Sequence, residues 1–265
     1  MFVAMTAAYG WRSSFLITAS VGFVWLAIWC FYYETPAKHK DVSTDELSYI
    51  NSDDDATAQV EQVGWLQALT YRETWGFAIA KFLTDPVWWF YLYWLPLYLT
   101  DVQKLSMAQM GWALPFVYLM ADFGSVAGGW LSGYFMRLGW PVGKARKVTM
   151  GICAACMPVA AMAAFAHEPV AAILLASIAT SAHQGWSANL YTTVSDVFPK
   201  AAVASVMGIG GCLGGLGGSL FSAVIPGYVV KYYGYAPVFL GLGLFHLTAL
   251  VFVHKLLGDM KPRRG

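Results

Sequence analysis

The sequence predicts an all-α membrane protein, a polytopic helix bundle with seven transmembrane helices. The first observation is composition, because 58% of the 265 residues are hydrophobic and only 12% are charged, against roughly 45–50% and 25% in soluble domains. The second is that seven apolar stretches reach the roughly 20 residues needed to cross a bilayer. The third is that lysine and arginine lie almost entirely between these stretches, and mostly on one side.

The seven predicted spans are separated from one another by polar or basic segments. Several spans exceed the minimum length, which allows a tilt without fixing its angle. They run over residues 14–33, 74–100, 109–135, 148–166, 170–191, 203–232 and 236–257.

Basic residues predict the orientation. Lys81 lies within a span, and of the other fifteen lysines and arginines only Arg12, Lys104 and Lys231 lie on one side. Because cytoplasmic loops carry the excess of lysine and arginine, this distribution predicts a cytoplasmic C-terminus. Seven crossings then place the N-terminus outside. We therefore expect a multi-pass protein of the cell inner (plasma) membrane, surrounded by the lipid bilayer.

A polar segment, residues 34–73, separates the first span from the six that follow. We predict that it is a solvated linker, since like charges repel and the segment has few apolar residues to bury. Residues 74–257 are then one six-helix unit, and residues 258–265 form a short cytoplasmic tail. The acidic residues of the linker include Asp41, Asp45, Glu46, Asp53, Asp54, Asp55 and Glu61.

The second span carries the most chemistry, in the segment KFLTDPVWWFYLYWLP from Lys81 to Pro96. Lys81 and Asp85 are four residues apart, so they share a helix face and can pair. Pairing offsets part of the roughly 2.5–3.5 kcal/mol that a charge costs at the bilayer centre. The pair either only stabilises the helix or faces an aqueous cavity and contacts a solute. Pro86 and Pro96 remove backbone hydrogen bonds and are expected to bend this span.

Aromatic residues follow the charged pair in the same span. Tryptophan and tyrosine stack on the apolar face of a sugar ring while their N–H and O–H groups bond hydroxyls. The alternative is a belt of aromatic residues at the membrane interface, which applies particularly to Trp94, near the outer surface. The residues concerned are Trp88, Trp89, Tyr91 and Trp94.

The third span contains one acidic residue, Asp122, near its middle. This residue is either a buried capping carboxylate or a site for a proton or another ion, and the sequence does not separate the two. Ser106 and Gln109 have the spacing of a capping box at the start of the same span, which is a structural feature.

The fifth span ends in SAHQGWSANLYTTVSDVFP, in which many polar groups lie at membrane depth and need partners on other helices or on a solute. Because histidine titrates near neutral pH, His183 is either a proton relay or a structural hydrogen-bond donor. Helical spacing places His183, Trp186 and Ser187 on one side, Gln184 and Tyr191 turned away from them, and Asn189 between the two faces.

The sixth span is rich in glycine, with seven glycines between Gly208 and Gly218. Such a helix allows very close backbone approach to its neighbours, and it also allows a bend during gating. The glycines do not form a phosphate-binding loop, which needs a strand before it and a helix after it. Cys153 and Cys156 form a CxxC pattern inside an apolar helix, where we expect apolar packing rather than redox or zinc chemistry.

The composition also excludes some classes of function. A net charge of +1 gives no indication of nucleic acid as a partner. A membrane enzyme using His183 or the two cysteines would need a clustered nucleophile and base, or a set of metal ligands, and the sequence has no such cluster. We therefore expect no enzyme activity, no cofactor and no metal.

The segment GGWLSGYFMRLGWPVGKARK, from Gly128 to Lys147, resembles the cytoplasmic loop signature of the major facilitator superfamily, which joins the eighth and ninth helices. Lys144, Arg146 and Lys147 match its basic end, whereas Gly133 stands near the position of a common acidic residue. The segments KFLTDPVWWFYLYWLPLYL and HQGWSANLYTTVSDVFP resemble the anion:cation symporter branch, and within it the hexuronate transporters. The resemblance covers essentially the whole chain.

This resemblance implies a transporter of two six-helix bundles, in which the seven spans correspond to helices 6–12. Residues 1–33 are then the end of the N-terminal bundle, and the chain is a C-terminal portion that lacks the first five helices. In related symporters the main proton-coupling acid and the substrate-binding arginine lie in the missing bundle, so full transport needs that bundle.

The function that follows as an expectation is proton-coupled transport of a sugar acid, such as a hexuronate, by alternating access. The alternatives are a transporter of another organic anion, such as an aldonate or aldarate, and a membrane fragment that transports nothing. Lys81 would attract the carboxylate of the solute, and Asp85 would hold Lys81 in place. Trp88 and Trp89 would stack on the sugar ring. Gln184 and Asn189 would form hydrogen bonds with its hydroxyls. The predicted solute site therefore comprises Lys81, Asp85, Trp88, Trp89, Gln184, Trp186 and Asn189, with Asp122 and His183 as proton or ion candidates.

Overall fold

The computed structural model describes residues 2–51 and 63–261, and it divides the chain into two compact units with the boundary after Glu61. The predicted linker, residues 34–73, and the predicted tail, residues 258–265, therefore lie partly outside the described residues. The acidic residues Asp53, Asp54, Asp55 and Glu61 are among those not described.

The first unit contains α1 (Phe2–Tyr32) and the short helix α2 (Thr44–Asn51), which lies in the predicted linker. α1 is interrupted at Gly10, whose φ of 77° is in the left-handed region that glycine adopts without strain. From Ala8 to Tyr32 the helix has the length and hydropathy of a membrane span. Its apolar side chains, such as Phe23, are exposed, as expected for a helix that contacts lipid or another membrane helix.

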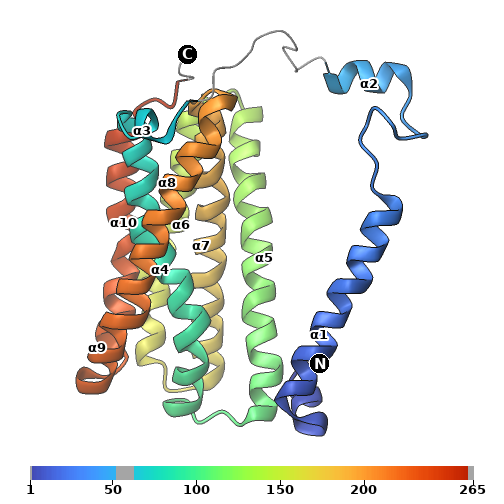
Figure 1. Cartoon of the computed structure of the whole chain (residues 1–265). Helices are drawn as coiled ribbons and strands as arrows, with labels where there is room; N and C mark the ends of the chain where they lie inside the picture. Colours follow the sequence, from blue (N-terminus) through green and yellow to red (C-terminus); the bar gives the residue numbers. More distant parts are fainter. Residues whose placement is uncertain (1, 52–62, 262–265) are drawn as a thin grey trace. The chain divides into compact units, whose positions relative to one another are not determined.

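The second unit is a helix bundle, and within residues 63–261 it contains six long helical rods that run side by side (Figure 1). The short α3 (Trp65–Ala68) precedes them. The rods are α4 (Arg72–Asp101), α5 (Met107–Arg137), α6 (Val142–Ala161) with the 3₁₀ turn η1 (Met162–Phe165), α7 (Pro169–Val197), α8 (Lys200–Gly218) with η2 (Ser219–Val224) and α9 (Ile225–Tyr233), and α10 (Ala236–Leu257).

Packing places α4 and α7 at the centre of this bundle. α4 packs against α8, α10 and α7, while α7 packs against α5 and α6, and α10 also contacts α6. The core between them is apolar and aromatic, and it includes the fully buried Phe77, Phe90, Trp186 and Phe239. Polar groups on α4 and α7 are therefore held among other helices rather than against lipid.

The predicted spans agree with α1 and the six rods. Five of these segments are long and apolar enough to cross a membrane by themselves, among the residues described. α4 and α7 have the length, at 30 and 29 residues, but their polar residues lower the hydropathy. α7 continues to Val197, six residues beyond the predicted end. The polar residues of this added part bond to carbonyls of the preceding turn, which satisfies their hydroxyl groups; these residues are Thr192, Thr193 and Ser195.

Prolines shape two of the rods without ending them. α4 is one helix through Pro86 and Pro96. In α9, Pro226 cannot donate to the carbonyl four residues earlier, that of Ser222. The indole N–H of Trp94 donates to this free carbonyl at 2.6 Å. The π-helical segment η2 lies directly before this proline and was not predicted, because the sequence pattern does not specify a wide turn.

One face of the glycine-rich α8 packs closely against α4. A Cβ at Gly210 would collide with Phe77, and one at Gly217 would collide with the backbone carbonyl of Phe82, which Pro86 leaves without its helical donor. A Cβ at Gly215 would meet no atom within 4 Å. The prediction of close helix packing is therefore confirmed for this face.

The predicted capping box at the start of α5 is also confirmed. The Ser106 hydroxyl accepts a hydrogen bond from the Gln109 N–H, and the Gln109 side chain accepts one from the Ser106 N–H at 2.8 Å. These bonds satisfy two N–H groups that the first turn of a helix leaves unpaired.

Candidate functional site

A buried ion pair forms the centre of the candidate site. Lys81 Nζ lies 2.7 Å from Asp85 Oδ2, and the two side chains are 6% and 19% exposed. Both residues come from the middle of α4, one turn apart, so the predicted pairing is confirmed. Gly214 of α8 makes room for the pair, because a Cβ at this position would collide with the Asp85 carboxylate. The ion pair therefore lies where α4 and α8 approach each other closely.

Tyr191 of α7 completes the surroundings of the lysine. Lys81 Nζ donates a hydrogen bond to the Tyr191 hydroxyl at 2.5 Å, and it lies 4.4 Å from the centre of the ring. Helical spacing predicts Tyr191 on the face of α7 turned away from His183, and Tyr191 is not among the predicted site residues. Its helical position gave the correct face, but no pattern indicated that this face meets Lys81.

Aromatic rings extend the site along α4. Trp88 stacks on His183 with the ring centres 5.8 Å apart and the planes 14° apart, and it meets Tyr118 of α5 edge to face. The Nδ1 atom of His183 lies 3.2 Å from Nε2 of His246, so one of the two rings donates to the other. Trp88 is half-buried, whereas His183 is 4% exposed.

Gln184 and Trp89 lie on different surfaces. Gln184 of α7 is half-buried, and its side chain makes no hydrogen bond within the described part of the chain. It is seven residues from Tyr191, which is two helical turns, so both lie on one face of α7. Trp89 instead lies against Gly218 of α8 and stacks on Tyr93 with the ring centres 5.8 Å apart. Trp88 and Trp89 thus contact different neighbours.

Two predicted site residues are fully buried. The Trp186 ring is 0% exposed and packs edge to face on His246. Asn189 is also 0% exposed, and its amide N–H groups donate to the carbonyls of Gly128 and Gly185 at 3.0 and 2.9 Å. Because these side chains are enclosed by protein, we do not retain them among the proposed solute contacts.

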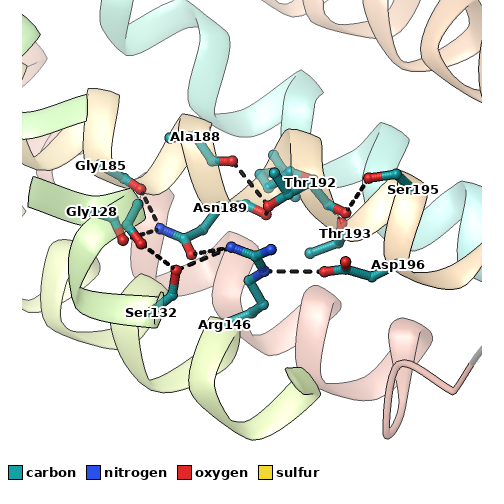
Figure 2. Close-up of polar contacts among 12 residues, drawn as sticks. Gly128, Ser132, Arg146, Gly185, Ala188, Asn189, Thr192, Thr193, Ser195 and Asp196 are labelled. Atoms are coloured by element: carbon teal, nitrogen blue, oxygen red, sulfur yellow. Dashed lines mark hydrogen bonds and ion pairs between the residues drawn. The ribbon is translucent and has the colours of Figure 1, made fainter. Parts of the chain in front are cut away.

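Asn189 belongs instead to a polar network that connects α5, α6 and α7 (Figure 2). The Arg146 guanidinium donates to Asp196 and to the Ser132 hydroxyl, both at 3.0 Å, and to the Asn189 side chain at 3.4 Å. Arg146 and Asp196 are 13% and 23% exposed. The sequence analysis identified Arg146 only as part of a basic loop; the lone carboxylate at the end of the fifth predicted span was the available signal for its partner.

Asp122 of α5 is exposed in the described part of the chain, which does not fit the first of the two alternatives, a buried capping carboxylate. The buried face of α5, which includes Gly128, packs against α7, and Asp122 points to the other side. Asp122 lies one helical turn from Tyr118, the residue that contacts Trp88. It is therefore on the same side of α5 as the aromatic part of the candidate site.

Membrane-length helices that enclose a paired lysine and a polar network define a multi-pass membrane protein with polar groups held inside its bundle. The chain belongs to the Major Facilitator Superfamily, whose sequence model matches residues 2–222. The resemblance carried by the loop signature is thereby confirmed at the level of the superfamily.

Similar curated proteins carry transporter names. The chain is 30% identical over 258 residues to the hexuronate transporter of Escherichia coli (strain K12), covering 96% of this chain and 59% of that protein. It is 28% identical over 262 residues to the D-galactonate transporter of Escherichia coli O6:H1, covering 95% and 60%. It is 30% identical over 133 residues to the galacturonate transporter of Dickeya chrysanthemi, covering 49% and 39%. The chain thus spans about 60% of the length of the first two relatives.

Proposed function

We propose that this protein takes part in the transport of a sugar acid, specifically a hexuronate, by alternating access coupled to protons. The observation that carries this proposal is the buried ammonium group of Lys81, because a cation inside a membrane bundle attracts an anionic solute. The identity to hexuronate, galacturonate and D-galactonate transporters supports the same class of solute.

The hydrogen bonds of Lys81 leave room for a carboxylate. An ammonium group has three N–H donors, and in this structure Asp85 and Tyr191 accept two of them. The third donor is available to a solute. Asp85 holds the ammonium in position and offsets the cost of its burial before the solute arrives.

Neighbouring side chains fit the rest of a sugar acid. The half-buried Trp88 offers an apolar ring surface for a sugar, and its contacts with His183 and Tyr118 fix its position. The Gln184 amide has free donor and acceptor groups for hydroxyls. We therefore centre the proposed site on Lys81, Asp85, Trp88, Gln184 and Tyr191, with Trp89 at its edge.

Proton coupling needs a titratable group with access to water, and Asp122 and His183 remain the two candidates in this chain. Asp122 is exposed and lies one turn from Tyr118 on α5. His183 is buried, and its only polar contact within the described residues is with His246. We favour Asp122 as the proton-coupling group because it is exposed, whereas His183 is buried. An N-terminal bundle completed by five further helices, a cytoplasmic C-terminus and location in the inner membrane are parts of the same proposal.

The main alternative solute is an aldonate, which the identity to a D-galactonate transporter supports. Hexuronates and aldonates both carry one carboxylate and several hydroxyls, and they differ in whether the sugar closes into a ring. A stacking tryptophan favours the ring form, so we place the hexuronate first. Competition of labelled glucuronate uptake by galacturonate, galactonate and galactarate separates these solutes.

The direct test is uptake of labelled glucuronate by cells that produce the complete reading frame containing these residues. Cells with the unaltered protein should accumulate glucuronate above cells with an empty vector. Lys81→Gln should lower the initial rate at least about tenfold, since a lost charge-assisted hydrogen bond costs roughly 1.5–3 kcal/mol. Lys104→Gln removes the same charge far from the pair and should leave the rate unchanged.

A second variant separates binding from folding. Lys81→Gln alone leaves Asp85 without its partner, and breaking a buried pair destabilises by roughly 3–5 kcal/mol. The double variant Lys81→Gln/Asp85→Asn removes both charges and should recover the amount of folded protein in the membrane but not the uptake. If the double variant imports glucuronate at the unaltered rate, the proposed carboxylate site is wrong.

A further inference from the structure

A basic groove lies between the first turn of α6 and the last turn of α10, away from the proposed solute site. Two adjoining cavities of about 740 and 330 Å³ form it, and they share Lys147, Val148 and His254 as lining residues. The larger cavity is also lined by Lys144 and Lys261, and the smaller one by Lys255.

The charge of this groove is strongly positive. Four lysines line it, and Asp259 is the one acidic residue among the lining residues described. Asp259 lies 3.9 Å from Lys261, but both side chains are more than 80% exposed, so this pair neutralises little of the charge. Lys144 lies 4.3 Å from the ring of Trp140, and within residues 2–51 and 63–261 no carboxylate pairs with its ammonium group.

The backbone adds to this positive field. α6 begins at Val142, and its N-cap residue Pro141 makes no side-chain bond to the first turn. The free N–H groups of a helix N-terminus carry a partial positive charge and favour anions. After α10 the chain turns through Gly258 and passes so close to Gly143 that a Cβ there would collide with the Asp259 carbonyl. Lys147 donates a hydrogen bond to the Gly258 carbonyl, which fixes this turn beside the groove.

The groove is apolar on its membrane side. The part of the groove away from the start of α6 and the end of α10 is lined by Val148 of α6 and by Leu250 and Val251 of α10. Both helices have the length and hydropathy of membrane spans, so this apolar part lies beside lipid tails. A basic end joined to an apolar strip matches the two parts of a phospholipid with a negative headgroup.

We propose that this groove binds an anionic phospholipid, with its phosphate near Lys144, Lys147 and Lys261 and an acyl chain along Val148 and Val251. This site is independent of the proposed function, because it shares no residue with the ion pair of α4. A bound lipid would connect the start of α6 to the end of α10 and would stabilise the turn after α10.

The test uses the purified chain of 265 residues in a mild detergent, with retained lipid counted by native mass spectrometry. Phosphatidylglycerol and phosphatidylcholine with the same acyl chains are the two probes. The unaltered chain should retain phosphatidylglycerol in clear excess. Lys144→Gln/Lys261→Gln should weaken this retention roughly thirtyfold, since each of the two basic residues near a membrane surface contributes about 1 kcal/mol. Lys38→Gln/Lys40→Gln removes the same charge outside the groove and should not change it.

Two further arms distinguish a lipid from a simple anion. Val251→Trp fills the apolar part of the groove without a change of charge, and it should also reduce retention of phosphatidylglycerol. Inorganic phosphate at the same concentration should not displace the lipid. Three outcomes would each overturn the proposal. They are equal retention of the two lipids, an equal loss of phosphatidylglycerol retention in both double lysine variants, and displacement of the lipid by inorganic phosphate.

Discussion

Lys81 Nζ and the Tyr191 hydroxyl are 2.5 Å apart, although the two residues are 110 positions apart in the sequence. This bond joins α4 to α7, the two central helices of the bundle. It also orients the ammonium group that Asp85 neutralises from the same helix. A solute that binds Lys81 therefore contacts a group held by two helices, and movement of either helix changes the geometry of the site.

Removal of one hydroxyl tests this relationship. Tyr191→Phe keeps the ring beside Lys81 but deletes the hydrogen-bond acceptor. A hydrogen bond to a charged group contributes roughly 1.5–3 kcal/mol, so we expect the KM for glucuronate uptake to rise about tenfold. The exposed Tyr228→Phe is the matched control. An unchanged KM in Tyr191→Phe, with normal amounts of protein, would separate this tyrosine from the site.

Close packing of α8 on α4 predicts different effects for two nearby glycines. In Gly217→Ala the new methyl group collides with the backbone carbonyl of Phe82, so we expect the free energy of unfolding to fall by about 1–3 kcal/mol. Gly215→Ala meets open space, and it should be neutral or stabilising by up to about 1 kcal/mol because alanine favours helices. Thermal unfolding of both variants in detergent measures the difference. Equal melting temperatures would contradict the packing described.

The polar network around Asn189 predicts a structural role for this residue. Asn189→Ala removes the bonds to the carbonyls of Gly128 and Gly185 and the acceptor for Arg146. We expect a loss of about 1–3 kcal/mol of stability and an unchanged KM in the protein that folds. Ser187→Ala on the same helix is the control. A raised KM at normal stability would return Asn189 to the solute site.

Proton coupling predicts a specific effect at Asp122. Asp122→Asn removes the only ionisable group of that side chain without a large change in volume. We expect accumulation of glucuronate against its gradient to fail, while exchange of labelled for unlabelled glucuronate continues. Both rates are measured in the same vesicles, with and without a pH gradient. Normal accumulation in this variant, and its loss in His183→Gln, would assign the proton to His183 instead.

The helices were predictable from the sequence because their causes are local. Span length and hydropathy gave the bounds of α10 as the structure has them. The predictions missed the start of α1, the start of α6 and the end of α7 by six residues or more, and the remaining ends by at most three. The capping box of Ser106 and Gln109 and the i,i+4 pair of Lys81 and Asp85 also lie within single helices. The capping box and the ion pair each join residues at most four positions apart.

Contacts between helices were not predictable in the same way. Tyr191 with Lys81, and Arg146 with Asp196, join residues 110 and 50 positions apart. Helical spacing gives the face on which each residue lies, but it does not give the rotation of one helix against another. For the same reason Asn189 was predicted to contact solute, although its partners Gly128 and Gly185 hold it inside the protein.

The central claim is that Lys81 recognises the carboxylate of the solute, and the ratio of inhibition by glucuronate and by uncharged glucose tests it most directly. In cells with the unaltered protein, unlabelled glucuronate should inhibit the uptake of labelled glucuronate, and glucose at the same concentration should not. In the low uptake that remains in Lys81→Gln/Asp85→Asn, this preference for the charged sugar should fall at least about tenfold. A double variant that keeps uptake and the full preference for glucuronate would contradict the account.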